Sequence, residues 1–323
     1  MLDRFGRNID YLRISVTENC NLKCIYCVDE NSILNSCDND ILSDDEIFKI
    51  AKECASLGIK KIRITGGEPL VRKNIENLIY RLKSINGIDE IYITTNGVLL
   101  KDKIEILKKN GLIGVNISLD SLNKDRFKKV TRFDKLSDVL FSIDKALDLG
   151  LKVKINTVIV DDINKDEIID FVNLTKHKNL DIRFIELMPI GAAKKYKGTS
   201  NKEINQIIKN SFKNIKLEYK NKLNGPADYI KIENYKGRVG FISPISSCFC
   251  EQCNRIRLTS KGFLKRCLHY NYGVDLKKHI RNNISDKDLN KLIYDNIYDK
   301  PQKHLFMEEC DNKDNKYMNQ IGG

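Results

Sequence analysis

The sequence of 323 residues contains no tryptophan, only four histidines and no long hydrophobic run. Without an apolar segment of about 18 residues, we expect no helix that spans a membrane. The N-terminal sequence MLDRFGRNID lacks the apolar region of a signal peptide, so we expect a cytoplasmic location. No Ser-His-Asp order, P-loop or dinucleotide fingerprint is present, which argues against the enzyme classes that depend on them.

The composition is that of a folded protein with a basic balance. Hydrophobic residues make up 41% and charged residues 31%, and the length can bury one large core or two unequal ones. The formal net charge is +12, which fits nucleic acid, a membrane surface or a small polyanionic substrate. The lysines are spread along the whole chain, so charge alone does not identify the partner.

Three of the ten cysteines lie in one short stretch after an alternating apolar segment at residues 11–16. Cys20, Cys24 and Cys27 have the spacing C-x3-C-x2-C. In a chain without an export signal, ten cysteines indicate metal or redox chemistry rather than disulfides. Thiolates select zinc, copper(I) or iron–sulfur clusters. A structural zinc site needs a fourth ligand, whereas a cubane bound by three cysteines leaves one iron open.

A second group of three cysteines follows the pattern C-x2-C-x13-C and consists of Cys250, Cys253 and Cys267. Residues 255–259 and the turn at 261–262 predict a short hairpin that returns the third cysteine beside the other two. Cys248 could add a fourth thiolate and so complete a zinc-ribbon-like site. His269 is a further candidate ligand, because it follows the third cysteine by two residues.

Strand-like and helix-like segments alternate through the first 187 residues. The strands are expected at 11–16, 60–65, 88–95, 112–118, 152–160 and 180–187, and the helices at 43–58, 74–84, 101–109, 135–149 and 165–176. Ser43 and Glu46 form a capping box for the first of these helices, and Gly58 ends it. Cys54 falls in this helix and is expected to be buried, while Cys37 and Cys310 receive no role.

The alternation predicts right-handed crossovers and an α/β fold with a parallel sheet. Six units are too few for a closed eight-stranded barrel, so we expect an open, partial (β/α)6 barrel of the TIM type. A doubly wound sheet is also compatible with the pattern.

A change in composition at residues 191–202 suggests a linker between two domains. We expect the partial barrel at 1–200 and a smaller C-terminal α+β domain at 201–323. The second domain should contain a hairpin made of residues 229–233 and 238–241.

The first cysteine motif, with Tyr26 directly before Cys27, resembles the radical S-adenosylmethionine (SAM) superfamily. The later segments resemble the GTP 3′,8-cyclase family (molybdenum cofactor biosynthesis protein A). They are Phe184-Ile-Glu-Leu-Met188, Gly225-Pro-Ala227, Gly240-Phe-Ile-Ser-Pro244, Phe249-Cys-Glu-Gln-Cys-Asn-Arg-Ile-Arg-Leu-Thr259 and the final Gly322-Gly323. The match covers nearly the full chain in the expected order. One departure is Cys248, where the family pattern has a residue other than cysteine.

The resemblance implies two [4Fe-4S] clusters and SAM as cofactors. Cys20, Cys24 and Cys27 would hold the cluster that binds SAM, and the second group would hold a cluster whose open iron binds guanine. Reductive cleavage of SAM would yield a radical that takes hydrogen from C3′ of GTP, and C3′ would then bond to C8. The product, (8S)-3′,8-cyclo-7,8-dihydroguanosine 5′-triphosphate, opens molybdenum cofactor (molybdopterin) biosynthesis.

The resemblance also assigns site residues. The SAM contacts are Tyr26, Gly67, Ser118 and Met188. The GTP contacts are Arg13, Arg63, Thr94, Lys154, Arg255, Ile256 and Arg257, and arginine suits them because it keeps its charge and binds phosphate in a bidentate manner. The residues expected to act in catalysis are Arg255, Arg257, Gly322 and Gly323.

The same family implies an electron donor such as flavodoxin or ferredoxin, and cyclic pyranopterin monophosphate synthase as the next enzyme. We expect neither a nucleic acid nor a membrane partner, and both a monomer and a homodimer fit the sequence. One alternative is a radical SAM peptide maturase, which would carry a longer C-terminal cysteine series. A basic zinc-ribbon RNA-binding protein is another, but its bases would stack on aromatics interleaved with Lys and Arg; here the aromatics are scattered.

Overall fold

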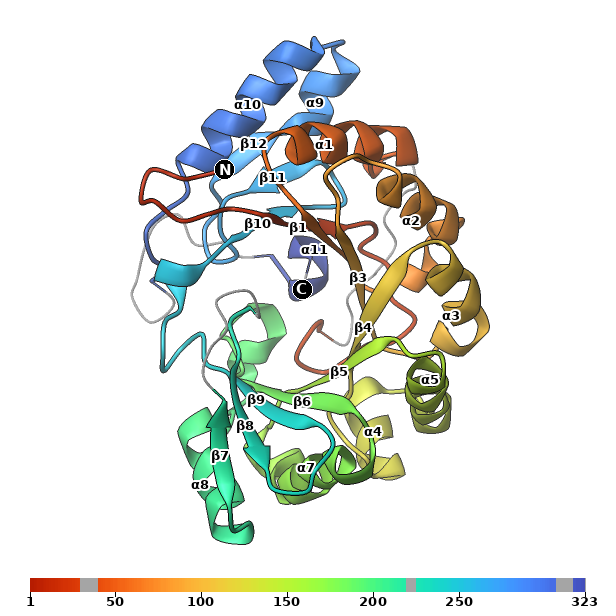
Figure 1. Ribbon diagram of the computed structural model, residues 1–323, viewed down its shortest axis with the longest axis vertical. Helices are drawn as coiled ribbons and strands as arrows, with labels where there is room; N and C mark the ends of the chain where they lie inside the picture. Colours follow the sequence, from red (N-terminus) through yellow and green to blue (C-terminus); the bar gives the residue numbers. More distant parts are fainter. Residues whose placement is uncertain (30–39, 219–224, 306–315, 323) are drawn as a thin grey trace.

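A twelve-stranded sheet organises the residues that the structure describes, 1–29, 40–218, 225–305 and 316–322, in this computed structural model (Figure 1). Its strands are β1 Tyr11–Ser15, β2 Lys61–Thr65, β3 Glu90–Thr95, β4 Leu112–Ser118, β5 Lys152–Thr157, β6 Leu180–Ile185, β7 Ile215–Glu218, β8 Asp228–Ile232, β9 Arg238–Ile242, β10 Arg255–Leu258, β11 Phe263–Lys265 and β12 Gly273–Asp275. Across the sheet their order is β12-β11-β10-β1-β2-β3-β4-β5-β6-β9-β8-β7.

Helices connect the strands and cover the outer side of the curved sheet, where Figure 1 shows α1, α2, α3, α5 and α7. The α-helices are α1 Asp44–Ser56, α2 Ile75–Lys83, α3 Leu100–Lys109, α4 Lys124–Thr131, α5 Leu136–Asp148, α6 Asp161–Asn164, α7 Ile168–His177, α8 Asn201–Ser211, α9 Leu276–Arg281, α10 Asp286–Tyr298 and α11 Met318–Ile321. Short 3-10 segments are η2 Pro69–Val71, η3 Lys165–Glu167, η4 Gly191–Lys195 and η5 Cys250–Gln252.

The six N-terminal strands are neighbours in chain order, and each pairs in parallel with the next. A doubly wound sheet would instead reverse its strand order at a switch point. The prediction of an open partial barrel is therefore confirmed, and the doubly wound alternative is wrong.

Side chains alternate strictly between the two faces of these strands. On β1, Leu12 and Ile14 are fully buried in the hydrophobic core, while Arg13 between them lines an inner cavity. The same alternation on β2 and β5 turns Arg63 and Lys154 inward. Because successive side chains of a strand point to opposite faces, the outer face packs on helices while the inner face carries polar groups. The core is consequently a layer between sheet and helices.

The C-terminal part of the chain extends the same sheet at both edges. Strand β9 pairs in parallel with β6, and β10 pairs in parallel with β1. The expected hairpin is present as the antiparallel pair β8 and β9. A division between residues 200 and 201 stays a prediction, because strands from both sides of it share one sheet.

Most expected elements are present, with shifts at their ends. The capping box of Ser43 and Glu46 starts α1, and Cys54 is fully buried. The fifth strand ends at Thr157 rather than at 160, because the next backbone amide is hydrogen-bonded to a side chain instead of to a neighbouring strand. The amide of Val158 donates to the Asp120 carboxylate at 2.8 Å.

Helix α4 was not expected from the sequence. Its N-cap residue, Asn123, accepts hydrogen bonds from the amides of Asp125 and Arg126, which is a recognisable start signal. The linker-like composition at 191–202 includes the short helix η4.

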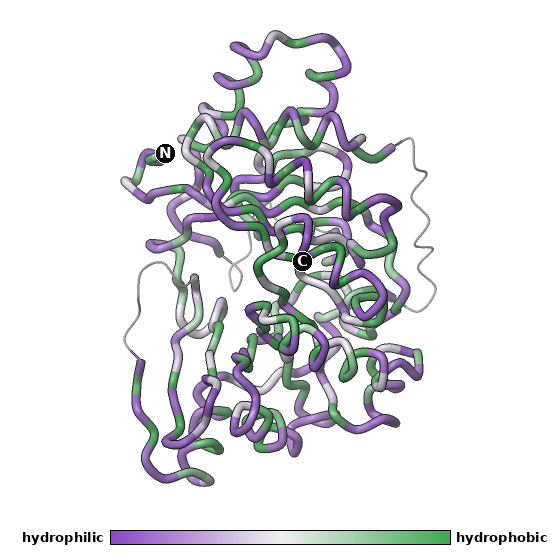
Figure 2. Tube along the Cα trace, turned by 45° about the vertical axis from the view of Figure 1, so that its right-hand side comes forward, coloured by the Kyte–Doolittle hydropathy of each residue, from purple (hydrophilic) through white to green (hydrophobic). Residues whose placement is uncertain are grey.

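Hydrophobic stretches along the chain are short. Figure 2 shows them alternating with hydrophilic segments throughout the tube. Among the described residues, none of the helices combines the length and the apolar character that a bilayer crossing requires.

The capping box of α1 provides a test of this local reading. We expect Ser43→Ala to lower the free energy of unfolding by about 1 kcal/mol, because the amide of Glu46 loses its acceptor. Ser211→Ala is the matched control: its hydroxyl bonds only within α8, so the change should stay within about 0.5 kcal/mol. Chemical denaturation measures both, and equal effects would show that the box does not stabilise the helix.

Candidate active site

A cavity of about 1620 Å³ is lined by the inner face of the sheet and by both cysteine groups. The cysteines on its wall are Cys20, Cys24, Cys27, Cys250, Cys253 and Cys267. Ten further predicted residues line it: Arg13, Tyr26, Arg63, Gly67, Thr94, Ser118, Lys154, Met188, Arg255 and Arg257. The fold thus gathers in one space residues from both ends of the chain.

Two of the predicted residues that the structure describes, Ile256 and Gly322, do not line this cavity. Ile256 is fully buried in the hydrophobic core, on the opposite face of β10 from its arginine neighbours. Only its backbone is therefore available to a ligand. Gly322 lies beside the cavity and contacts Arg257, whereas Gly323 is outside the described residues, as are Cys37 and Cys310.

The first cysteine loop rests directly on the Gly66-Gly67 turn at the end of β2. The amide of Gly67 donates to the carbonyl of Thr17 at 2.8 Å. A Cβ on Gly67 would lie 2.4 Å from the carbonyl oxygen of Asn19 and 2.5 Å from that of Glu18. Only glycine permits this approach, so the turn positions the loop that holds the three thiols.

A buried carboxylate, Glu68, anchors the same turn from behind. It accepts hydrogen bonds from the amides of Leu70 and Asn96 and from the hydroxyl of Thr95. Burial nevertheless raises the pKa of Glu68 to about 7. The side-chain amide of Asn96 in turn lies 3.7 Å from the sulfur of Cys20. This support was not identified in the sequence, although Glu68 follows the glycine pair directly.

Tyr26 is held by Asp120, a second residue missed from sequence. The tyrosine hydroxyl donates to the Asp120 carboxylate, whose other oxygen accepts from the amide of Val158. Burial raises the pKa of Asp120 to about 6, against the effect of these hydrogen bonds. The hydrogen bond between Tyr26 and Asp120 therefore ties the first cysteine loop to the segment that follows β4.

The second cysteine group is brought together by the predicted hairpin. Strands β10 and β11 are antiparallel, with Leu258 opposite Leu264. Burial favours the neutral thiol of Cys253, but the charges of Arg255 and Lys300 outweigh it and lower the pKa to about 6. A thiolate is the form that binds metal, so this cysteine is prepared as a ligand.

His304 lies beside this group, although it is distant from it in sequence. The sulfur of Cys248 is 3.7 Å from its Nε2. His269, the histidine singled out from the sequence, makes an edge-to-face contact with the ring of Tyr270. Its ring centre lies 6.3 Å from that of His304. No spacing rule points to His304, because the segment that carries it returns from α10.

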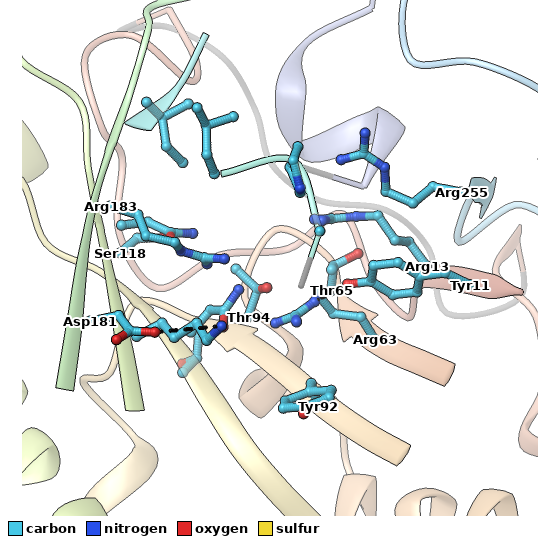
Figure 3. A pocket seen from close by; sticks show the side chains of 18 of the residues that line it. Tyr11, Arg13, Arg63, Thr65, Tyr92, Thr94, Ser118, Asp181, Arg183 and Arg255 are labelled. Atoms are coloured by element: carbon cyan, nitrogen blue, oxygen red, sulfur yellow. Dashed lines mark hydrogen bonds and ion pairs between the residues drawn. The ribbon is translucent and has the colours of Figure 1, made fainter. Parts of the chain in front are cut away.

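Arginines on three adjacent strands lie side by side on the inner face of the sheet. Arg13 is directly opposite Arg257 in the β1–β10 register and opposite Arg63 in the β1–β2 register. Figure 3 shows Arg13, Arg63 and Arg255 around the same space. Burial and the neighbouring charge of Arg257 lower the pKa of Arg13 well below its usual value. Burial and Arg255 lower the pKa of Arg257 to about 10.

A second set of cations lines the opposite wall. Burial and the charge of Arg183 lower the pKa of Lys154 to about 8, and Asp181 lies 3.6 Å from its amine (Figure 3). Arg183 itself donates to the side-chain oxygen of Asn156 at 2.9 and 2.5 Å. Arg183 was missed from the sequence, although the two-residue period of β6 places it on the inner face.

Tyr11 completes the basic wall. Burial favours its neutral form, but the charges of Arg63 and Arg13 prevail and lower its pKa to about 8. Its hydroxyl accepts a hydrogen bond from Nε of Arg63.

The C-terminal segment reaches this site. A guanidinium nitrogen of Arg257 donates to the carbonyl of Gly322 at 3.0 Å, and the side-chain amide of Asn319 donates to the carbonyl of Glu18 at 3.1 Å. Ile321 is buried against Ile190. The end of the chain is therefore tied both to the basic wall and to the first cysteine loop.

Together these features describe a cavity with two sets of three cysteine thiols and a cationic surface that is buried or half-buried. Each set offers three soft ligands, which suits an iron–sulfur cubane with one open iron. Burying like charges is unfavourable without an anion. The arrangement can hold two clusters and a strongly anionic small molecule within one enclosed space.

Two family models match successive parts of the chain. The model described as the radical SAM superfamily matches residues 14–175, and the one described as Molybdenum Cofactor Synthesis C matches residues 180–306.

Curated relatives match over the whole length. A GTP 3′,8-cyclase of Clostridium perfringens (strain SM101) is 53% identical over 100% of both chains. A GTP 3′,8-cyclase of Clostridium botulinum (strain Okra) is 48% identical, again over 100% of both. Among solved structures, SuiB of Streptococcus suis bound to S-adenosylmethionine has a TM-score of 0.66 at 18% identity, covering 90% of this chain and 67% of its own. That likeness supports the fold alone.

The contact between Gly67 and the first cysteine loop makes a specific prediction. We expect Gly67→Ala to displace the loop, because the new Cβ would clash with backbone carbonyl oxygens, and these can move only if the loop backbone moves with them. Overpacking of this kind costs about 1–3 kcal/mol. Anaerobic iron analysis should show loss of the first cluster's iron while the second cluster's iron is kept.

Gly150→Ala is the matched control for this variant. Gly150 also turns the chain but has no atom within 4 Å of its Cβ position, so only its positive φ is strained. Its iron content should be unchanged. Full iron content in Gly67→Ala would show that the loop does not depend on the close approach.

Proposed function

This chain belongs to the GTP 3′,8-cyclase family of radical SAM enzymes, and we propose that the cavity residues described above perform that family's reaction. The reaction is the SAM-dependent radical cyclisation of GTP to (8S)-3′,8-cyclo-7,8-dihydroguanosine 5′-triphosphate. It is the first step of molybdenum cofactor biosynthesis. Its cofactors are SAM and two [4Fe-4S] clusters.

One observation carries the assignment of residues: buried and half-buried cations converge between two sets of three cysteines in a single cavity. A triphosphate is the group that such a wall best accommodates, because arginine forks match phosphate oxygens. We assign this role to Arg13, Arg63, Lys154, Arg255 and Arg257. Thr94 adds a hydroxyl on the same inner face.

Cys20, Cys24 and Cys27 would hold the cluster that binds SAM. When bound, that cluster supplies the electron that cleaves SAM and generates the radical attacking GTP. The chain's own part is placement: Gly67 keeps the loop close to β2, and Asp120 fixes Tyr26. Ser118 and Met188 line the same region of the cavity and would contact SAM.

Cys250, Cys253 and Cys267 would hold the second cluster, which would supply an open iron for binding the purine. The basic strand β10 runs from this group toward the middle of the cavity, so the arginines can bind a nucleotide whose base reaches the second group. The backbone at Ile256 remains available, since its side chain is in the core.

The C-terminal glycines would exclude water and position the nucleotide. The carbonyl of Gly322 already occupies one donor of Arg257, so the tail fixes that side chain's orientation. A glycine tail suits a narrow cavity because it has no side chain to clash.

The wider setting is also part of the proposal. The unstable product would pass to cyclic pyranopterin monophosphate synthase, and a flavodoxin or ferredoxin would supply electrons. Both reactions are expected in the cytoplasm. The peptide-maturase and RNA-binding alternatives are not favoured, because full-length relatives at about half identity are GTP cyclases and the converging arginines lie inside a cavity.

The arginines provide the functional test. We expect Arg255→Ala and Arg257→Ala each to reduce GTP cyclisation at least about 10- to 100-fold, the equivalent of one lost charged hydrogen bond. Uncoupled cleavage of SAM should persist, because the first cysteine group is untouched. Both products can be quantified by mass spectrometry after anaerobic incubation with a strong reductant.

Arg81→Ala is the control, since Arg81 lies on the surface of α2 and pairs with Asp45. It should leave both rates unchanged. If the cavity variants lose SAM cleavage and cyclisation equally, these arginines are structural rather than substrate-binding.

A further inference from the structure

Three metal-ligating side chains from two separate segments meet beside the second cysteine group. The sulfurs of Cys248 and Cys250 and a ring nitrogen of His304 all lie within 4.8 Å of one another. Among the described residues, this is the place where three such groups are close enough to share one ion. Neither the family resemblance nor the reaction uses Cys248 or His304.

The spacing between Cys248 and His304 suits two ligands of one ion rather than a corner of a cubane. With metal–sulfur bonds of about 2.3 Å and metal–nitrogen bonds of about 2.0–2.1 Å, the ligand atoms of a tetrahedral ion lie roughly 3.6 Å apart. The distance from the Cys248 sulfur to Nε2 of His304 is 3.7 Å. In a cubane each thiolate binds a different iron, so its sulfurs diverge. Cys248 is therefore placed to share an ion with Cys250.

A buried arginine, Arg7, connects the segment that carries Cys250 to the segment that leads to His304. The guanidinium of Arg7 donates to the carbonyl of Cys250 at 2.9 Å and to the carbonyls of Pro301 and Gln302 at 2.8 and 3.0 Å. Its Nε donates to the carboxylate of Asp3 at 2.6 Å. The chain that leads to His304 is thus fixed against the cysteine segment before any metal arrives. Cys248 is exposed, which gives an ion a path from solvent.

We propose that Cys248, Cys250 and His304 bind one soft divalent transition-metal ion, such as Zn²⁺, in the chain that has not yet received its second cluster. Binding would release one proton from each thiol, while the histidine binds through its neutral ring. A water molecule or a further donor would take the fourth position, as in open zinc sites. No electron transfer is involved.

Occupation of this site excludes the second cluster. Cys250 belongs to both ligand sets, so an ion held here occupies a thiolate that the cluster requires. The inference rests on the proposed function only for the assignment of Cys250 to the second cluster.

Cobalt(II) is a direct probe, because thiolate-bound tetrahedral cobalt absorbs strongly. The titration uses the full-length, cluster-free chain under anaerobic conditions, with Cys20, Cys24 and Cys27 replaced by serine to remove the first cysteine group. We expect one cobalt ion per chain. Cys248→Ser and His304→Gln should each weaken cobalt binding by more than about 10- to 100-fold, which is the loss expected when a residue that only hydrogen-bonds a metal ligand is removed. His269→Gln, in the neighbouring ring, should leave the affinity unchanged.

X-ray absorption at the cobalt edge tests the ligand set without altering it, which covers a variant that fails to fold. Two sulfurs and one nitrogen support the site, and three or four sulfurs overturn it. Loss of cobalt in Cys253→Ser or Cys267→Ser, with normal binding in Cys248→Ser and His304→Gln, also overturns it. Because none of these readouts involves GTP, failure of cyclisation would refute the proposed function and leave this result standing.

Discussion

Repulsion among cations that are buried or half-buried on the inner face of the sheet is the constraint on which the rest of the structure depends. The strand registers place Arg63, Arg13 and Arg257 side by side on three adjacent strands. Like charges directly opposite one another destabilise a sheet, and burial adds a desolvation penalty. Burial and the charge of Arg257 lower the pKa of Arg13, while burial and the charge of Arg255 on the same strand lower the pKa of Arg257. Such a surface is stable when an anion occupies it, and a nucleotide triphosphate provides one.

The pairing of β1 with β10 determines where that anion lies relative to the two cysteine groups. Strand β1 leads into the first cysteine loop, and β10 begins just after Cys250 and Cys253 of the second group. Because these two strands are hydrogen-bonded neighbours, the two thiolate sets come to line one cavity. The carbonyl of Gly322, near the C-terminus, then accepts a hydrogen bond from Arg257 on β10. Sequence segments at opposite ends of the chain thus form a continuous site.

The alternating fold, the capping box of α1 and the hairpin that returns Cys267 followed from local rules of periodicity, capping and turns. Short-range motifs also located the six cysteines, and the family resemblance supplied most of the basic wall. Arg183 was missed although the same period of two that turns Lys154 inward applies to it. His304 and Arg7 could not have been found this way, because their positions depend on how distant segments pack. Asp120 and Glu68 were missed because buried carboxylates are identified by burial, which a single sequence does not reveal.

Equilibrium binding of nucleotides to the protein with both clusters in place tests the central claim most directly. If the buried cations hold the triphosphate, affinity should fall in the order GTP, GDP, GMP, guanosine, and the affinity for GTP should weaken as salt is raised. Guanosine binding as tightly as GTP, with no dependence on salt, would contradict the account.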